Sequence, residues 1–145
     1  IATSNAGTAE IQAGLKSGTT LAQIKATLFE SVLMKHYAPE LLNRFDGVIL
    51  FTPLSQVEVE QIARLQLVSL ALQLDKEKGI TFAYTDAAVS FIATHGYDQA
   101  LGARPIRRFI QDSVENLLAD ALLTKRPGRG TTLSLDVTGE SLTLT

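Results

Sequence analysis

An apolar stripe at helical spacing, directly after a Gly-Ala-Arg-Pro tetrapeptide, constrains the fold of this chain more than any other feature. Its members recur at i, i+4, i+8, i+11, i+12, i+15 and i+16, which places them on one face of a helix; they are Ile106, Ile110, Val114, Leu117, Leu118, Ala121 and Leu122. Proline suits the first helical turn, so the helix is expected to begin at Pro105. Other elements must cover the apolar face, so we expect a packed core.

Clear start and stop signals define a second, longer helix. Ser55-x-x-Glu58 has the pattern of a capping box, and Gly79 has the pattern of a C-terminal stop. The apolar positions between them extend around more than one face of the helix. We therefore expect this helix to pack on two sides.

A small sheet is expected near the end of the chain. A strand over 80–84 is followed by a short helix that ends at Gly96, and alternating segments over 131–137 and 141–145 have the pattern of a hairpin. The hairpin can join the strand over 80–84 in one sheet.

The first fifty residues carry weaker signals. Residues 1–5 look like the tail of a buried strand, and a polar segment that contains three glycines is assigned no element. Helical spacing predicts a helix over 21–35, and Pro39 can open a short helix that runs to Asn43. The apolar run over 48–51, closed by a proline, predicts a buried strand.

Composition and missing motifs exclude several classes of function. The formal net charge of −2 gives no electrostatic case for nucleic acid, and no apolar run approaches the length of a membrane span. We expect an intracellular protein, because the sequence shows neither a secretory signal nor a membrane span. The absence of cysteine excludes disulfides and agrees with a reducing compartment. The two histidines are far apart and lack metal-ligand spacing, so no metal site is expected. GxSxG, GxGxxG and GxxxxGK[ST] are also absent.

The start of the helix at Pro105 also predicts an anion site. Free N–H groups and the helix dipole favour negative charge there, and the Arg104 guanidinium can form a fork of hydrogen bonds to a phosphate. Gly102 allows a close backbone approach. The alternative is an arginine that is solvated or paired with a neighbouring carboxylate.

Asn5 and Arg44 are further candidates with ordinary alternatives. Asn5 lies where a strand would end, a place where open α/β sheets hold ligand-facing side chains, but Ser-Asn-Ala-Gly is also a common turn sequence. Arg44 follows the short helix. It either pairs with Glu40 or Asp46 or projects to serve a neighbouring molecule.

Five motifs, in order and in register along essentially the whole chain, resemble the C-terminal part of the second ATPase module of Clp-type AAA+ unfoldases. They are Thr3-Ser4-Asn5, Pro39-Glu40-x-x-Asn43-Arg44-x-Asp46, Phe51-x-Pro53-Leu54, Gly96-Tyr97-Asp98 and Gly102-Ala103-Arg104-Pro105. The resemblance implies an α+β fold. Residues 1–53 would be the C-terminal end of the large α/β nucleotide-binding domain, and 54–145 a complete small domain with helices and a three-stranded sheet.

The resemblance also implies roles for the candidate residues. Asn5 looks like sensor 1, which helps place the attacking water, and Arg44 looks like the arginine finger, which reaches the nucleotide of the adjacent subunit in a homo-hexamer. Arg104 looks like sensor 2, beside Gly102 and Ala103 at the nucleotide. The cofactor would be ATP with Mg²⁺, bound by the full-length protein.

The family's remaining ATPase motifs would lie upstream of Ile1. Both Walker segments and the pore loop belong there, so the resemblance implies the C-terminal part of a longer protein. By itself this chain is expected to bind no nucleotide and hydrolyse no ATP. Residues 1–53, which would lack their parallel neighbours, are expected to rearrange, swap domains or dimerise.

A short connection indicates the subfamily. Ala9-Glu10-Ile11-Gln12 resembles the ClpB-type disaggregases, whereas Ala13-Gly14-Leu15 is only a weak echo of the loop that docks on a peptidase ring. We therefore expect a cytoplasmic chaperone that acts on unfolded or aggregated polypeptide. The alternatives are a protease-linked ATPase with a peptidase-ring partner and a stand-alone module that binds AAA+ rings.

Overall fold

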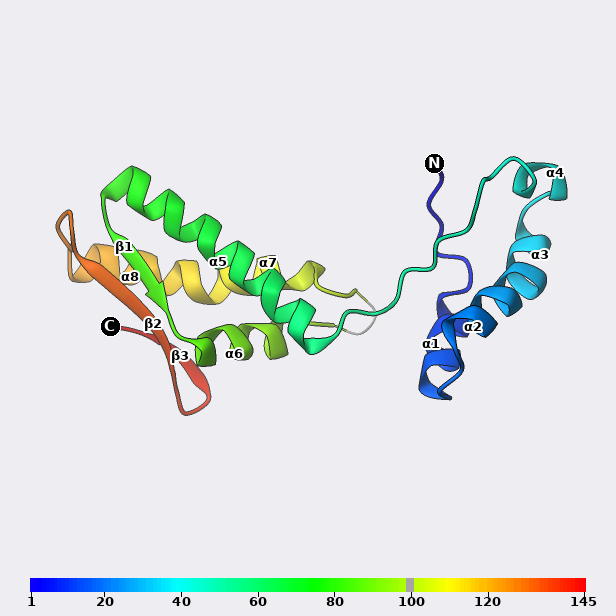
Figure 1. Ribbon diagram of the computed structural model, residues 1–145. Coiled ribbons are helices and arrows are strands. Elements are labelled where there is room, and N and C mark those ends of the chain that lie inside the picture. The colour runs from blue at the N-terminus through cyan, green and yellow to red at the C-terminus, as the bar shows by residue number, and fades with distance from the viewer. Residues whose placement is uncertain (99–100) are drawn as a thin grey trace. The chain divides into compact units, whose positions relative to one another are not determined.

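The computed structural model describes residues 1–98 and 101–145 (Figure 1). The chain divides into two compact units, Ile1–Thr52 and Pro53–Thr145. The described chain combines helices with a three-stranded sheet, which confirms the predicted α+β class.

The first unit is built from short helices. They are α1 (Thr8–Lys16), α2 (Leu21–Leu28), the π-helical η1 (Phe29–Leu33), α3 (Met34–His36) and α4 (Pro39–Leu42). The helices expected over 21–35 and from Pro39 are confirmed, and α1 was not predicted. Gly14 lies within α1, where a Cβ would come within 2.7 Å of Cγ1 of Ile24. Glycine thus lets α1 lie close against α2.

The core of the first unit is small. Its fully buried side chains are Ile24, Leu28 and Val32, and only four further apolar residues pack partly against them. So few buried side chains hold this unit with little hydrophobic free energy.

The two strands expected in the first unit are wrong. Residues 1–5 and 48–51 are irregular, and the side chains of Ile49 and Phe51 are each 82 % exposed. A strand must pair its backbone N–H and C=O groups with another strand. No other strand exists in the described residues 1–52, so an apolar run alone does not make one.

The second unit contains the sheet and the longer helices. Its elements are α5 (Gln56–Lys78), β1 (Thr81–Tyr84), α6 (Asp86–Gly96), α7 (Arg104–Phe109), the π-helical η2 (Ile110–Glu115), α8 (Asn116–Thr124), β2 (Thr132–Thr138) and β3 (Ser141–Leu144). The strand order is β1-β2-β3. β1 runs parallel to β2, and β2 and β3 form the predicted antiparallel hairpin.

Local capping explains where α5 begins and ends. The Ser55 N–H donates to Oε2 of Glu58 at 2.8 Å, and the Ser55 hydroxyl accepts from the Glu58 N–H. This is the predicted capping box, and Ser55 lowers the pKa of the Glu58 carboxyl. Gly79 ends the helix with φ at +65°, a left-handed conformation that favours glycine.

One face of α5 packs into the core of the second unit. Val59, Ala63 and Leu67 are buried there with side chains from all three strands. The two-sided packing expected for α5 is wrong for the described chain, because Leu65 is 69 % exposed and Leu72 is 67 % exposed. The apolar residues on this second face have no cover within the described residues.

Two π-helical segments keep buried side chains in line. Buried residues lie four apart at Ile106, Ile110, Val114 and Leu118. At 3.6 residues per turn, each step of four overshoots a full turn by about 40°. The wider turn of η2 absorbs this excess, and η1 does the same for the four-spaced core of the first unit. The helix predicted from Pro105 is thus one run over 104–124 that begins one residue earlier and contains a π turn.

Candidate functional site

A closed loop presents the start of α7. The Asp98 N–H donates to the Gly102 carbonyl at 3.1 Å, and the Gly102 N–H donates to the Asp98 carbonyl at 2.7 Å. The Asp98 carboxylate accepts from the Leu101 N–H at 2.8 Å. Gly102 has φ at +66°, and nothing lies within 4 Å of the position where a Cβ would be. Backbone conformation therefore explains this glycine, and the space beside it is open.

Arg104 stands exposed directly after this loop. It is the first residue of α7, and the next turn is anchored because Ile106 is fully buried and donates its N–H to the Ala103 carbonyl at 3.1 Å. Within 1–98 and 101–145 no carboxylate pairs with Arg104. In the described residues, the structure therefore contradicts the alternative in which a neighbouring carboxylate pairs with Arg104. Gly102, Ala103 and Arg104 together form an open, cationic corner that suits one phosphate group.

The motif Gly96-Tyr97-Asp98 helps to position the start of α7. A Cβ on Gly96 would lie 3.0 Å from Cα of Ile106, so glycine lets the end of α6 lie directly against α7. Tyr97 packs partly against the core, and Asp98 then forms the loop described above. The packing of α6 on α7 thus fixes where Arg104 begins its helix.

Asn5 and Arg44 both belong to the first unit. The Asn5 carbonyl accepts from the Thr8 hydroxyl at 2.8 Å, which forms the turn into α1, and its side chain is exposed. Arg44 is exposed just after α4, and no ion pair joins it to Glu40 or Asp46 in the described part of the unit. The amide and the guanidinium are both free to meet groups from elsewhere.

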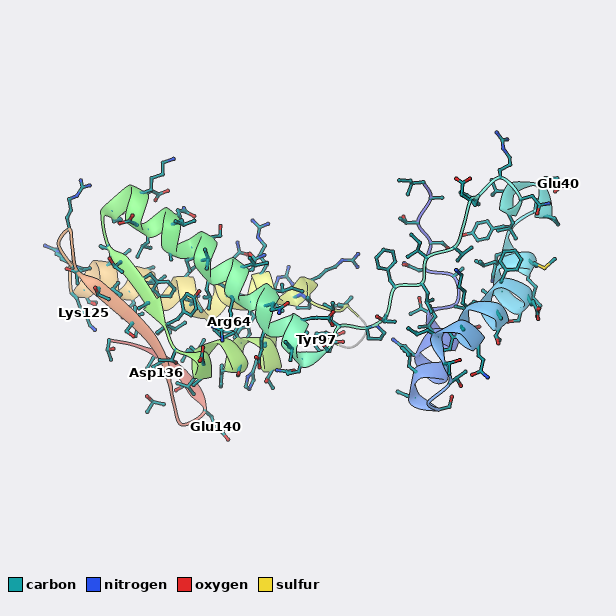
Figure 2. The ribbon with its side chains drawn as sticks, in the orientation of Figure 1. Glu40, Arg64, Tyr97, Lys125, Asp136 and Glu140 are labelled. Carbon is teal, nitrogen blue, oxygen red and sulfur yellow. The ribbon has the colours of Figure 1, made fainter. Side chains whose placement is uncertain are left out.

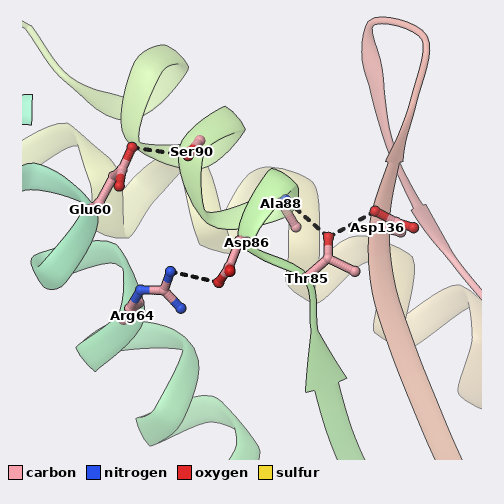
Figure 3. A network of polar contacts seen from close by, with 7 residues as sticks. All are labelled: Glu60, Arg64, Thr85, Asp86, Ala88, Ser90 and Asp136. Carbon is pink, nitrogen blue, oxygen red and sulfur yellow. Dashed lines mark hydrogen bonds and ion pairs between the residues drawn. The ribbon is translucent and has the colours of Figure 1, made fainter. Parts of the chain in front are cut away.

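Sequence reasoning missed a polar network in the second unit (Figure 3). Arg64 of α5 donates from Nη2 to Oδ1 of Asp86 on α6 at 2.7 Å, and the Ser90 hydroxyl of α6 donates to the Glu60 carboxylate of α5 at 2.9 Å. The hydrogen bond to Asp86 raises the pKa of Arg64. Both partners are solvent-exposed, so the pair orients α6 more than it stabilises the fold.

The same network ties the start of α6 to the sheet. The Thr85 hydroxyl accepts from the Ala88 N–H at 3.2 Å and donates to Oδ1 of Asp136 on β2 at 2.7 Å. The hydrogen bond from Thr85, together with one from the Val137 N–H, lowers the pKa of the Asp136 carboxyl. A threonine just before a helix is a common cap in sequences, but nothing in the sequence marks a partner 51 residues away.

The described residues contain no group of three or more histidine, aspartate or glutamate side chains that could hold a metal ion. In the same residues, no helix combines the length and the apolar character that crossing a membrane requires. The open corner at Arg104 can contact a phosphate.

Comparison with known proteins adds to this geometry. Residues 54–135 match the family described as the C-terminal, D2-small domain of ClpB protein. The chain is 39 % identical over 140 residues to the chaperone protein ClpB of Rhodopirellula baltica, 37 % identical over 147 residues to that of Bacteroides thetaiotaomicron, and 42 % identical over 123 residues to that of Vibrio vulnificus strain YJ016.

The matches cover 97 %, 98 % and 85 % of this chain. They cover only 16 %, 17 % and 14 % of the three relatives. The similarity therefore extends along nearly the whole of this sequence, and the sequence spans a small part of each relative.

Proposed function

The chain belongs to the ClpB family, and from that membership we propose that it serves an ATP-dependent protein unfoldase and disaggregase that works as a homo-hexamer. The observation that carries this proposal is Arg104, which stands exposed and unpaired within the described residues after the closed loop at Gly102. Residues 1–53 would supply the end of the large nucleotide-binding domain and 54–145 its small domain.

Each candidate residue has a definite task in this proposal. Arg104, beside Gly102 and Ala103, forms a fork of hydrogen bonds to a phosphate and reports the nucleotide state to the small domain. Arg44 projects to the adjacent subunit and stabilises the charge that develops on the transferred phosphoryl group. The Asn5 amide orients the attacking water. The full-length protein would supply the remaining contacts to ATP and Mg²⁺.

The names of the relatives favour disaggregation over the protease-linked alternative. All three are described as chaperone protein ClpB. We infer an unfolded or aggregated polypeptide as the substrate and the cytoplasm as the location.

A chimera tests the proposed roles. Residues 1–145 would replace the matching 140-residue segment of the Rhodopirellula relative, and ATP hydrolysis and the recovery of a heat-aggregated enzyme would be measured. We expect Arg44→Ala to lower the hydrolysis rate by at least about 10³-fold, because a finger residue stabilises transition-state charge. Arg104→Ala should raise the KM for ATP and uncouple recovery from hydrolysis.

Arg108→Ala is the matched control, since it removes an exposed arginine from the same short helix. It should leave both measurements close to those of the unmodified chimera. Equal activity in the Arg44, Arg104 and Arg108 variants would contradict the assigned roles. Binding of the chimera to a peptidase ring, without recovery of aggregates, would favour the protease-linked alternative.

A further inference from the structure

An open hollow on the second unit takes no part in the proposed nucleotide chemistry. Its volume is about 380 Å³, and its walls come from α6, from the helical run over 104–124 and from the turn between β2 and β3. The residues that define its chemistry are Phe91, His95, Phe109, Ser113, Glu140 and Ser141.

Three stacked or tilted rings form one wall of the hollow. The ring centroids of Phe91 and His95 are 3.9 Å apart with planes at 27°, and those of His95 and Phe109 are 6.1 Å apart with planes at 19°. His95 Nδ1 lies 2.8 Å from the Phe91 carbonyl oxygen. Because a carbonyl only accepts, Nδ1 carries a proton, and in the neutral tautomer that this bond selects Nε2 is an acceptor. The exposed imidazole is therefore held in a fixed plane with its acceptor nitrogen free.

The polar groups of the hollow are mainly acceptors and hydroxyls. Figure 2 places Glu140 at the turn of the β2–β3 hairpin, and no cation pairs with it in the described chain. No lysine or arginine lines the hollow among the described residues. Ser113 lies in η2, and π turns of this kind recur at functional sites. An anionic ligand would meet the Glu140 carboxylate, so the charge favours a cation.

We propose that this hollow binds an arginine side chain of a polypeptide. A planar guanidinium can stack on the wall of rings and donate hydrogen bonds to the Glu140 carboxylate, to the serine hydroxyls and to Nε2 of His95. Leu117 and Leu142 also line the hollow, so the aliphatic stem of the arginine can pack against them while its charged head reaches Glu140. The proposal does not depend on ATP hydrolysis or on the roles of Arg44 and Arg104, so it can fail or hold independently of them.

The test is a nuclear magnetic resonance titration of the isotope-labelled 145-residue chain. The probe is a blocked tripeptide with a central arginine, compared with the same peptide that carries citrulline, which has a similar shape and no charge. We expect the arginine peptide to shift the resonances of Phe91, His95 and Ser141 at millimolar concentration, and the citrulline peptide to bind about tenfold more weakly. Equal binding of the two peptides, or no shift with either, would overturn the proposal.

Glu140→Gln separates charge recognition from folding, because Glu140 is exposed in a turn. The variant should bind the arginine peptide about five- to tenfold more weakly and should bind the citrulline peptide as the original chain does. Glu77→Gln, which removes an exposed carboxylate from α5 outside the hollow, should bind the arginine peptide as the original chain does. A loss of the same size in both variants would indicate general charge attraction and would refute the site.

Discussion

At the scale of single residues, Thr85 performs two tasks at once. It caps α6 through the Ala88 N–H and also donates to the Asp136 carboxylate on β2. One hydroxyl thus fixes both the first turn of a helix and its position on the sheet.

Thr85→Val should lower the free energy of unfolding by about 1 kcal/mol at about pH 7, since an N-cap is lost. The Asp136 pKa is lowered in the folded state, so its contribution is present above the ordinary aspartate pKa and is lost as pH falls through the folded-state pKa. The difference between variant and original chain should therefore shrink towards about pH 3. Urea unfolding followed by circular dichroism at both pH values measures this.

Thr94→Val provides the comparison for this prediction. Its hydroxyl donates only to the Ser90 carbonyl at 2.8 Å within α6, so no carboxylate is involved. Its effect should not change between the two pH values. A Thr85 effect that is independent of pH would show that the bond to Asp136 adds nothing to stability.

Residue-scale features were predictable where partners lie close in sequence. The capping box of Ser55 and Glu58 and the stop at Gly79 can be recognised from a few neighbouring letters. The pair of Arg64 and Asp86 could not be predicted, because its members lie 22 residues apart and their contact depends on how α5 packs on α6. The position of Arg104 at the start of a helix was predicted, whereas the hydrogen bonds between Asp98 and Gly102 were not.

At the scale of elements, the distance in sequence between hydrogen-bonding partners again decides which segments were predicted correctly. Periodicity located α5 and the β2–β3 hairpin, because each forms most of its backbone hydrogen bonds within itself. The run over 48–51 has the composition of a strand but lacks a neighbouring strand. Composition gives an element's preference, and the presence of a partner decides the outcome.

The π turn of η2 gives an element-scale prediction. Deleting the exposed Gln111 would convert η2 to a regular helix, and the buried residues around it would then follow spacings of four and three, which suit 3.6 residues per turn. Deleting the exposed Ala119 of α8 would instead move Ala121 out of line with Leu118. We expect the Gln111 deletion variant to unfold cooperatively in urea. Its free energy of unfolding should be at least about 1 kcal/mol higher than that of the Ala119 deletion variant. The reverse order would mean that the π turn itself stabilises the core.

At the scale of the whole molecule, the two units differ greatly in what holds them together. The core of the second unit contains side chains from helices and from all three strands, whereas three residues of one helical run make up that of the first. The first unit is therefore expected to open at far lower free energy.

Hydrogen exchange checks this difference across the chain. Amides of α1 and α2 should exchange with opening free energies near zero to about 2 kcal/mol, and those of Val89, Ile92 and Leu135 with values near the global free energy of unfolding. A chain cut to residues 53–145 should keep the slow amides. Uniform protection along the whole sequence would contradict the expectation that the second unit is much more stable than the first.

The parallel pairing of β1 with β2 also sets an order in time. β2 and β3 meet across a turn of two residues, but Thr81 finds Thr132 only after the intervening helices have brought the chain back. Closing a long loop costs entropy that local contacts do not, so pairings of high sequence separation form late. We therefore expect the hairpin and the helices to form early and β1 to complete the sheet late in folding. The edge of the sheet that Thr85 ties to Asp136 should therefore be the last part of the fold to form.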